Sequence, residues 1–388
     1  VDQPEPLGTG NALATAIPAL ASDCEYILLI NGDLPLIRQK TLEKLVDCHL
    51  DNLATITLLT SLLPISQATG LGFVVRGETG APVSIIEAAE QSEPYEGTVE
   101  INVGAYCISM NWLREAITSL KAHPNGEVQV TDLVGKAFAD DHKIASVVIE
   151  DSSEGLGVND RAQLACAEAA MQSRLRLHWM KRGVTMDDPL TTYLESGVEL
   201  AEDVKILPNT SLKGSTFIGR GSTIGPNAIC VDTSIEENCI VRNATLEETV
   251  IESNVDIGPY CYLRAGTYIE NGTHIGSHVE IKDSRIGANC TLGHFSYIGD
   301  ATLGPRVNIG AGTVTCNYDG KQKHRTDIGA DAFIGSDSML VAPVKIGDRA
   351  TTGAGSVVTK DVAPDSVMVG VPAYELPESR LRSKKTNT

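Results

Sequence analysis

The sequence lacks an apolar run long enough to cross a membrane, and it lacks an excess of positive charge. None of its hydrophobic stretches reaches about 18 residues, the length expected of a membrane-spanning helix. Lysine and arginine number 31 against 50 aspartates and glutamates, a formal net charge of −19. We therefore expect no membrane insertion and no general binding to nucleic acids. A few local cations still suffice for a phosphate site.

The cysteines also lack a pattern. Nine are scattered along 388 residues, without a CxxC pair or a spacing typical of metal ligands. An odd number fits the reduced thiols of a cytoplasmic protein better than a disulfide framework. The chain begins with Val1 instead of Met, has no signal-peptide pattern, and reaches its first motif by Gly8. We expect a cytoplasmic protein from which N-terminal sequence is missing.

Residues 1–158 have the pattern of an α/β domain. Apolar runs at Tyr26–Ile30, Ala54–Leu63 and Lys143–Glu150 predict strands, the first of them buried. Helices are predicted between the strands, at Thr41–Asp51 and Asn111–Ala122. This alternation predicts a mainly parallel sheet with helices on its faces. In such a sheet, the loops at the carboxyl ends of the strands carry ligands.

The middle of the chain predicts a connecting helix. Residues 159–182 contain no glycine or proline, and Gly183 is expected to end the helix. We expect residues 184–206 to form a transition segment, residues 207–373 to form a second domain, and residues 374–388 to form a C-terminal tail.

Aliphatic residues recur every six positions in the second domain, with occasional steps of five. Glycine often follows them, as in Ile218-Gly219 and Ile275-Gly276. The positions are Ile218, Ile224, Ile257, Leu263, Ile269, Ile275, Ile281, Ile286, Leu292, Ile298, Leu303, Ile309, Ile328, Ile334, Leu340 and Ile346. Neither a helix nor a two-faced strand has this period. It indicates a parallel β-helix, in which three hexapeptides make a coil of about 18 residues.

The period breaks once at length, between Ile309 and Ile328. The polar, basic segment Asn317–Arg325 lies within the break and cannot continue the coil. We expect it to project as a loop, either as a tolerated surface insertion or as a binding loop. Its composition suits an anion, and we favour binding.

Short motifs in both halves point to one family. In the first half they are Leu7–Ala12, Asn31–Leu36, Thr69–Gly72, Glu100–Asn102 and Gly157–Arg161. In the second half they are Leu263–Gly266, Val279–Lys282, Gly293–Asp300, Val307–Gly312 and Cys316–Gly320. Together they resemble the bacterial bifunctional N-acetylglucosamine-1-phosphate uridyltransferase/glucosamine-1-phosphate acetyltransferase family over nearly the whole chain. The last three motifs are specific, whereas many acyltransferases share the hexapeptide repeat.

The resemblance implies a fold and two reactions. The fold is an α/β nucleotidyltransferase-like (Rossmann-like) domain, here incomplete at its N-terminus, followed by a left-handed parallel β-helix of hexapeptide repeats. The β-helix domain forms a homotrimer with sites between subunits, and it transfers acetyl from acetyl-CoA to glucosamine 1-phosphate. The first domain joins UTP and N-acetylglucosamine 1-phosphate with Mg²⁺, which gives UDP-N-acetylglucosamine for cell-wall precursors.

The resemblance makes His294 the general base of acetyl transfer. The amine of glucosamine 1-phosphate must lose a proton as it attacks the thioester, and an imidazole accepts protons near neutral pH. Glu280 is a candidate to orient the ring. The alternative is a structural histidine, although Gly293, Tyr297 and Asn308 lie nearby in the sequence.

Other residues are assigned to substrates by similarity. Arg264 and Lys282 bind the sugar phosphate, unless they form surface ion pairs instead. Sugar contacts are assigned to Tyr297, Asn308, Asn317, Tyr318 and Lys323, and acetyl-CoA contacts to Ala311, Ser336 and Ala354. Gly370 departs from the family, which often has an arginine there for the coenzyme A phosphates. The basic residues between Arg380 and Lys385 are candidates to compensate.

The first domain matches the uridyltransferase site in part. Asp33 and Asn159 match the Mg²⁺ ligands; the alternative is that Asp33 is an ordinary loop carboxylate at a strand end, and we favour the metal site. Uridyltransferase substrate contacts are assigned to Gln3, Gly8, Thr9, Gly72, Glu87, Asn102 and Asn159. Asn31 replaces a common aromatic residue. The family's glycine-rich, basic nucleotide loop belongs upstream of Gln3 and is not in this chain, so we expect no uridyltransferase activity from the chain as it stands.

Three other functions stay open. A related transferase would use a different sugar, such as galactosamine 1-phosphate. A β-helix metalloenzyme of the γ-carbonic-anhydrase kind would need three histidines around Zn²⁺, and His274, His278 and His294 are the candidates. Their different offsets within the repeat argue against convergence. A non-catalytic trimeric scaffold would not need His294 at all.

Overall fold

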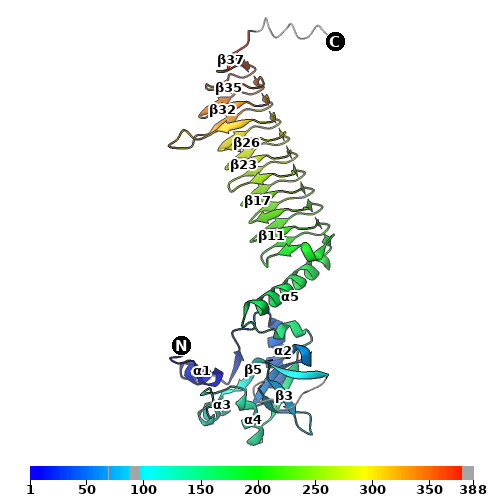
Figure 1. Cartoon of the computed structure of the whole chain (residues 1–388), viewed down its shortest axis with the longest axis vertical. Coiled ribbons are helices and arrows are strands. Elements are labelled where there is room, and N and C mark those ends of the chain that lie inside the picture. The colour runs from blue at the N-terminus through cyan, green and yellow to red at the C-terminus, as the bar shows by residue number, and fades with distance from the viewer. Residues whose placement is uncertain (69, 88–96, 378–388) are drawn as a thin grey trace. The chain divides into compact units, whose positions relative to one another are not determined.

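The computed structural model divides the chain into two compact units, residues 1–171 and 172–388. It describes residues 1–68, 70–87 and 97–377 (Figure 1). Within these ranges, no helix combines the length and the apolar character that a membrane crossing requires. All nine cysteines are free thiols.

The first unit contains one mixed sheet. Its strands are β1 (Tyr26–Ile30), β2 (Ile56–Pro64), β3 (Phe73–Arg76), β4 (Pro82–Ile86), β5 (Thr98–Ser109) and β6 (Ile144–Val148). The order is β4-β3-β5-β2-β6, with β1 also paired to β5. The predicted strands are confirmed, but the mainly parallel sheet is wrong. Among the described strands of this unit only β2 and β6 pair in parallel, because the long strand β5 runs antiparallel to β1, β2 and β3.

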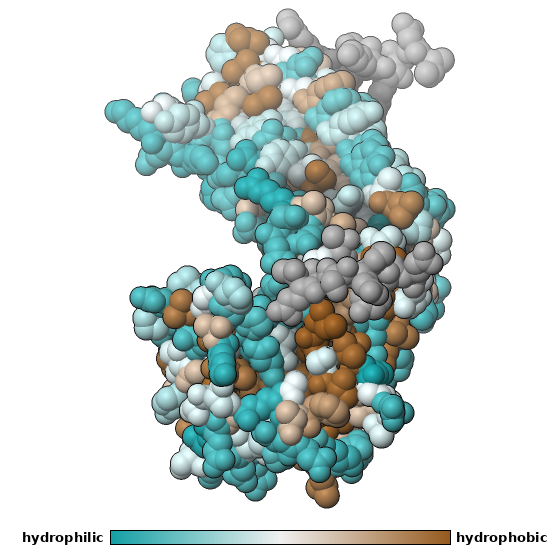
Figure 2. All heavy atoms as spheres, turned by 60° about the horizontal axis from the view of Figure 1, so that its bottom comes forward, coloured by the Kyte–Doolittle hydropathy of each residue, from teal (hydrophilic) through white to brown (hydrophobic). Residues whose placement is uncertain are grey.

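Strand β1 is less buried than its apolar sequence indicated. Tyr26, Leu28 and Ile30 are 36–40% exposed, and they alternate with half-buried residues. The strand pairs on one side, with β5. An apolar run cannot reveal how many neighbours a strand has, so full burial was the wrong expectation. Apolar residues also gather as a patch on the face of this unit seen in Figure 2.

Helices flank the sheet and connect to the second unit. They are α1 (Thr9–Ala16), α2 (Gln39–Asn52), α3 (Met110–Ala116), α4 (Asp132–Ala139) and α5 (Arg161–Met180). The helix expected at 111–122 is shorter, because a 3₁₀ turn follows at Ile117–Ser119. The connecting helix is confirmed as α5. Asp160 caps it by accepting from the Gln163 amide at 2.7 Å, and Gly183 follows with φ 93°.

The second unit is a solenoid with three parallel sheets, called faces 1, 2 and 3 here. Face 1 contains β7 (Thr185–Met186), β10 (Lys205–Ile206), β13 (Thr223–Ile224), β16 (Ile240–Val241), β19 (Asp256–Ile257), β22 (His274–Ile275), β25 (Thr291–Leu292), β28 (Asn308–Ile309), β31 (Phe333–Ile334), β34 (Thr351–Thr352), β36 (Val367–Val369) and the antiparallel β37 (Tyr374–Glu375). Face 2 contains β8 (Tyr193–Leu194), β11 (Ser211–Lys213), β14 (Ile229–Val231), β17 (Thr245–Glu247), β20 (Tyr262–Leu263), β23 (Glu280–Lys282), β26 (Tyr297–Gly299), β29 (Val314–Cys316), β32 (Met339–Val341) and β35 (Val357–Val358). Face 3 contains β9 (Glu199–Leu200), β12 (Phe217–Ile218), β15 (Ser234–Ile235), β18 (Val250–Ile251), β21 (Tyr268–Ile269), β24 (Arg285–Ile286), β27 (Ala301–Leu303), β30 (Thr326–Ile328) and β33 (Val344–Ile346).

The inward residues of the faces form the core. Leu263, Ile281 and Ile298 pair in register on successive strands of face 2, and all three are fully buried. Each aliphatic side chain therefore packs on its counterparts in the coils above and below, which is the contact that the period of six predicted. The architecture matches a left-handed β-helix.

The solenoid begins earlier than the sequence pattern indicated. Strand β7 at Thr185 already pairs in parallel with β10, so the segment expected as a transition forms the first coil. Its inward residues include Met186 and Leu194, which do not stand out from an irregular segment in the sequence.

The segment Asn317–Arg325 projects from the solenoid between β29 and β30, as expected (Figure 1). A short antiparallel bridge joins Tyr318 to Lys323. At its tip, the Asp319 carboxylate accepts from the amides of Lys321 and Gln322 and lies 2.8 Å from His324 Nε2. These contacts, chiefly the one from Gln322, lower the pKa of Asp319 to about 2. The loop thus has a defined shape of its own.

Candidate active sites

The corner between faces 1 and 2 carries a column of outward positions, one per coil. The Gly312 amide donates to the carbonyl of His294 at 2.9 Å, and the Asp337 amide donates to that of Ala311 at 2.7 Å. The same contact recurs one coil further on, from Gly355 to Ser336. The four predicted residues of the column are His294, Ala311, Ser336 and Ala354. The predicted base and the three predicted acetyl-CoA residues therefore lie along a single edge of the solenoid.

His294 is held by the coil below it. Its Nδ1 lies 3.1 Å from the hydroxyl of Ser277, which occupies the same corner one coil earlier. When Nδ1–H donates to this hydroxyl, Nε2 carries the lone pair that a general base needs. The orienting role suggested for Glu280 stays a prediction. Glu280 lies on β23 in face 2, where its carboxylate accepts from Arg264 at 3.0 Å.

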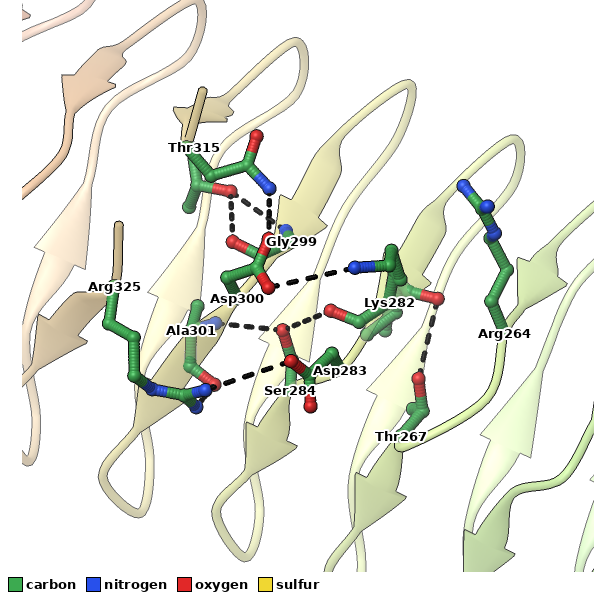
Figure 3. A network of polar contacts seen from close by, with 12 residues as sticks. Arg264, Thr267, Lys282, Asp283, Ser284, Gly299, Asp300, Ala301, Thr315 and Arg325 are labelled. Atoms are coloured by element: carbon green, nitrogen blue, oxygen red, sulfur yellow. Dashed lines mark hydrogen bonds and ion pairs between the residues drawn. The ribbon is translucent and has the colours of Figure 1, made fainter. Parts of the chain in front are cut away.

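A second cluster lies at the opposite edge of face 2, where the projecting loop begins (Figure 3). The buried carboxylate of Asp300 lies 3.6 Å from Lys282 Nζ and accepts a hydrogen bond from the Asn317 side-chain amide. The same amide lies 3.4 Å from the Tyr297 hydroxyl. Gly299 lies beneath them, and a Cβ at this position would collide with both side chains.

Two lysine side chains meet in this cluster. Lys282 lowers the pKa of Lys323, first because Lys282 donates a hydrogen bond to the Lys323 amine and also because the two like charges repel each other. The pKa of Lys282 is raised, first because it donates to the Lys323 amine and also because Asp300 and Asp283 lie nearby. When both lysines are protonated, their two positive charges exceed the single negative charge of the buried Asp300 carboxylate. Such a pair suits an added dianion such as a phosphate.

The remaining predicted sugar residues divide between the faces. Arg264 lies on face 2, ion-paired to Glu280 and 5.6 Å from the centre of the Tyr262 ring. Arg264 and Lys282 therefore do form ion pairs within the chain, which leaves their assignment to the phosphate a prediction. Asn308 lies on face 1, across the corner from face 2, and Tyr318 is exposed on the loop.

The histidines of the zinc alternative have separate partners. His274 on face 1 lies 3.2 Å from Asp256, whereas His278 stacks on Phe295 with ring centroids 4.8 Å apart. His294 contacts Ser277. In the part of the chain that the structure describes, no group of three or more His, Cys, Asp or Glu is arranged around a metal position.

The first unit contains a cleft of about 380 Å³. Seven of the eight residues predicted for the uridyltransferase and metal sites line it, and they are Gly8, Thr9, Asp33, Gly72, Glu87, Asn102 and Asn159. Gln3 is not among its lining residues; its side-chain amide donates to Asn11 at 2.7 Å and to the Gly8 carbonyl at 3.3 Å. Thr69 of the third motif lies outside the described residues. The cleft thus gathers residues that are far apart in the sequence.

The two predicted metal ligands are brought together by the backbone. The Val158 amide donates to the Asp33 carbonyl at 3.0 Å, so Asn159 follows directly beside the Asp33 loop. Gly157 allows this approach, since an added Cβ would lie 3.3 Å from the Asp33 carboxylate. One carboxylate and one amide oxygen at the edge of a cleft are a donor set that Mg²⁺ accepts.

The charged residues that line this cleft, among those described, are all acidic. Asp33, Glu87 and Glu127 line it, and no lysine or arginine is among its described lining residues. Glu87 accepts from the Thr131 hydroxyl at 2.9 Å, and Asn102 donates to the buried Tyr106 hydroxyl at 2.6 Å. Burial raises the pKa of Tyr106. A phosphate chain bound here would need added cations.

Sequence reasoning missed Ser277 and Asp300. Ser277 occupies the position of His294 one coil earlier, so the repeat spacing itself could have identified it. Asp300 ends the Gly293–Asp300 motif, but nothing in that motif reveals that its carboxylate is buried. Gly370, with φ 97°, brings no charge to the last coils, and the basic residues from Arg380 onward lie outside the described residues.

Comparison with known proteins covers both units. The family described as nucleotidyl transferase matches residues 1–183. Bacterial transferase hexapeptide repeats match residues 248–283, 283–317 and 325–360, and a hexapeptide repeat of succinyl-transferase matches residues 216–244. The chain is 40% identical over 371 residues to the bifunctional protein GlmU of Streptococcus equi subsp. zooepidemicus, which covers 95% of this chain and 80% of that protein. The corresponding protein of Desulfitobacterium hafniense is 39% identical over 386 residues, with 99% and 84% covered. That of a Synechococcus species is 41% identical over 364 residues, with 94% and 80% covered.

Proposed function

Because this chain belongs to the family of bifunctional GlmU proteins, we propose that it acetylates glucosamine 1-phosphate with acetyl-CoA. The nucleotidyl transferase domain serves the second reaction of the family, in which N-acetylglucosamine 1-phosphate and UTP give UDP-N-acetylglucosamine. The observation that carries the first assignment is the corner column, where one imidazole lies in line with three small residues, with the lysine cluster at the opposite edge of face 2.

Acetyl transfer follows from the chemistry of these groups. The amine of the sugar attacks the thioester carbonyl while His294 Nε2 takes its proton. Collapse of the tetrahedral intermediate breaks the carbon–sulfur bond, and the imidazolium returns the proton to the departing thiolate. Ala311, Ser336 and Ala354 have small side chains, which would let the arm of the coenzyme lie close to this corner. The sugar contacts are assigned to Arg264, Lys282, Tyr297, Asn308, Asn317, Tyr318 and Lys323.

We propose that the active protein is a homotrimer whose acetyl-transfer sites lie between chains. His294 stands at one edge of face 2, and the loop with Lys323 begins at the other edge. Asn308 lies on a different face, and the loop projects away from its own solenoid (Figure 1). Neighbouring copies can bring these separated groups around one small sugar. The substrates and the free thiols suit a cytoplasmic enzyme.

We further propose that Asp33 and Asn159 bind Mg²⁺ in the first unit. Bound there, the ion would neutralise charge on the phosphates and bridge them to the protein. The acidic lining of the cleft supports this assignment, because Asp33, Glu87 and Glu127 would otherwise repel a triphosphate.

The test is an acetyl-CoA assay with paired acceptors. We expect turnover of glucosamine 1-phosphate and a much lower kcat/KM for galactosamine 1-phosphate. A preference for galactosamine 1-phosphate would overturn the sugar assignment, and failure to acetylate either acceptor would overturn the activity. Sedimentation of the same sample measures the oligomer, and a monomer with full activity would exclude shared sites.

A further inference from the structure

We propose that Asp300 is a positioning residue of the acetyl-transfer site, whose buried carboxylate holds Lys282 and Asn317 around the phosphate of the sugar substrate. This proposal rests on the proposed function and adds to it a residue that does not itself touch the substrate. A carboxylate so close to a phosphate site is otherwise unfavourable, because like charges repel.

Backbone hydrogen bonds place Asp300 between the strand that ends at Lys282 and the strand that begins at Thr326. Its amide donates to the Lys282 carbonyl at 3.0 Å, and its carbonyl accepts from the Thr326 amide at 3.1 Å. Lys282 ends the strand below, and Thr326 begins the strand that follows the projecting loop. Asp300 thus lies where the loop joins the solenoid.

The carboxylate uses both of its oxygens. Oδ1 faces Lys282 Nζ at 3.6 Å (Figure 3). Oδ2 accepts from the Asn317 side-chain amide. Asp300 is 6% exposed and Asn317 is 8% exposed, so water competes little for these contacts. Charge-assisted contacts of this kind are the strong ones, and a buried carboxylate that lost its partners would carry a large penalty.

Acidic residues at the same corner of other coils behave differently. Asp232 also has a left-handed backbone, with φ 48° against 51° for Asp300, and its amide likewise donates to the coil below. The Asp232 side chain is exposed, and its carboxylate accepts a hydrogen bond from the Ser215 backbone amide. The corner therefore tolerates an exposed acid, and burial with two functional partners is particular to Asp300.

Charge gives the proposal a measurable consequence. Lys282 lowers the pKa of Lys323, and Asp300 opposes that shift. The other charged or titratable groups that act on the two lysines are Asp283, Arg264 and Tyr297. Replacing Asp300 by a neutral side chain removes the opposing carboxylate, so Lys323 should lose its proton at a lower pH.

The test compares Asp300→Asn with the control Asp232→Asn in the full chain, with kcat and KM for glucosamine 1-phosphate measured against pH. For Asp300→Asn we expect KM to rise about tenfold near neutral pH, in line with a lost charged contact, with kcat within about twofold. The alkaline rise of KM should begin at a lower pH than in the unsubstituted protein. The control should change neither quantity.

A purely structural role would reduce kcat or thermal stability and leave the alkaline rise of KM where it was, and that result would overturn the proposal. Asp300→Ser is a second variant with the same expected shift, in case the first does not fold. Calorimetry with inorganic phosphate separates this proposal from the proposed function. If the unsubstituted chain lacks acetyl transfer, weaker phosphate binding in Asp300→Asn alone still supports the role of Asp300, and equal binding in all proteins refutes it.

Discussion

The two candidate sites handle phosphate in opposite ways. The cleft of the first unit presents Asp33, Glu87 and Glu127 and has no cation among its described lining residues. The cluster on the solenoid brings Lys282 and Lys323 together beside one buried carboxylate, that of Asp300. The first therefore needs cations from elsewhere to hold a phosphate, whereas the second supplies its own. We expect the two reactions to differ in their dependence on metal, pH and single lysines.

The largest effect should come from His294→Ala. Loss of the general base should reduce kcat for acetyl transfer by about 10²–10⁴-fold. The substitution lies in the second unit, so nucleotide binding in the first unit should not change. The matched control is His274→Ala, which removes an imidazole that lies on face 1 beside Asp256. Equal rates for both variants would favour a scaffold over an enzyme.

Lys282→Ala should have the next largest effect. The phosphate would lose a charged partner, and the buried carboxylate of Asp300 would lose the lysine that it pairs with. We expect KM for glucosamine 1-phosphate to rise by roughly 10- to 100-fold with a smaller change in kcat. Titrations of initial rate against sugar phosphate measure both constants. An unchanged KM would show that the phosphate of the substrate does not bind at this cluster.

Lys323→Arg should have a smaller effect that depends on pH. The pKa of Lys323 is lowered, so the protonated form that attracts phosphate is present below that pKa and is lost as pH rises through it. An arginine remains charged over this range, so the variant should keep a low KM at alkaline pH. The comparison requires KM from pH 7 to 10 in both proteins. If KM rises equally at alkaline pH in the unsubstituted protein and in Lys323→Arg, a group other than Lys323 causes the rise.

Metal removal should leave the smallest effect on the solenoid site. Because its lysines supply the positive charge, EDTA should leave acetyl transfer unchanged. Mg²⁺ titration of the first unit should instead depend on Asp33, and Asp33→Asn should weaken binding of the ion. Acetyl transfer that falls on chelation would contradict the contrast between the two sites.

The sequence predicted most of the solenoid because one physical rule repeats there. Every inward aliphatic residue packs on its counterparts, so the spacing of Leu263, Ile281 and Ile298 already specifies a coil. The first coil was missed because Met186 and Leu194 follow the rule without its glycines. In the first unit the expectation of a mainly parallel sheet was wrong, because β5 runs antiparallel to its neighbours. Apolar runs in a sequence reveal strands but not their direction.

The candidate sites were predicted only where a motif carried them. His294 and the acetyl-CoA residues fall on one column because each is one coil from the next, which is a property of spacing. His294 contacts Ser277 within the chain. This contact depends on the direction in which the imidazole points from the corner, and the spacing of the repeat does not specify that direction. Similarly, Asp300 became visible only when the burial of its carboxylate was known.

The corner column also has a metric consequence. Neighbouring parallel strands lie about 4.8 Å apart, so the three steps from His294 to Ala354 amount to roughly 14 Å along the solenoid. An extended thioester carrier that lies along this edge therefore passes one column residue per coil, at equal spacing. The distance between any two column residues follows from the number of coils between them. The length of each step is set by backbone hydrogen bonds between coils, such as that from the Gly312 amide to the His294 carbonyl.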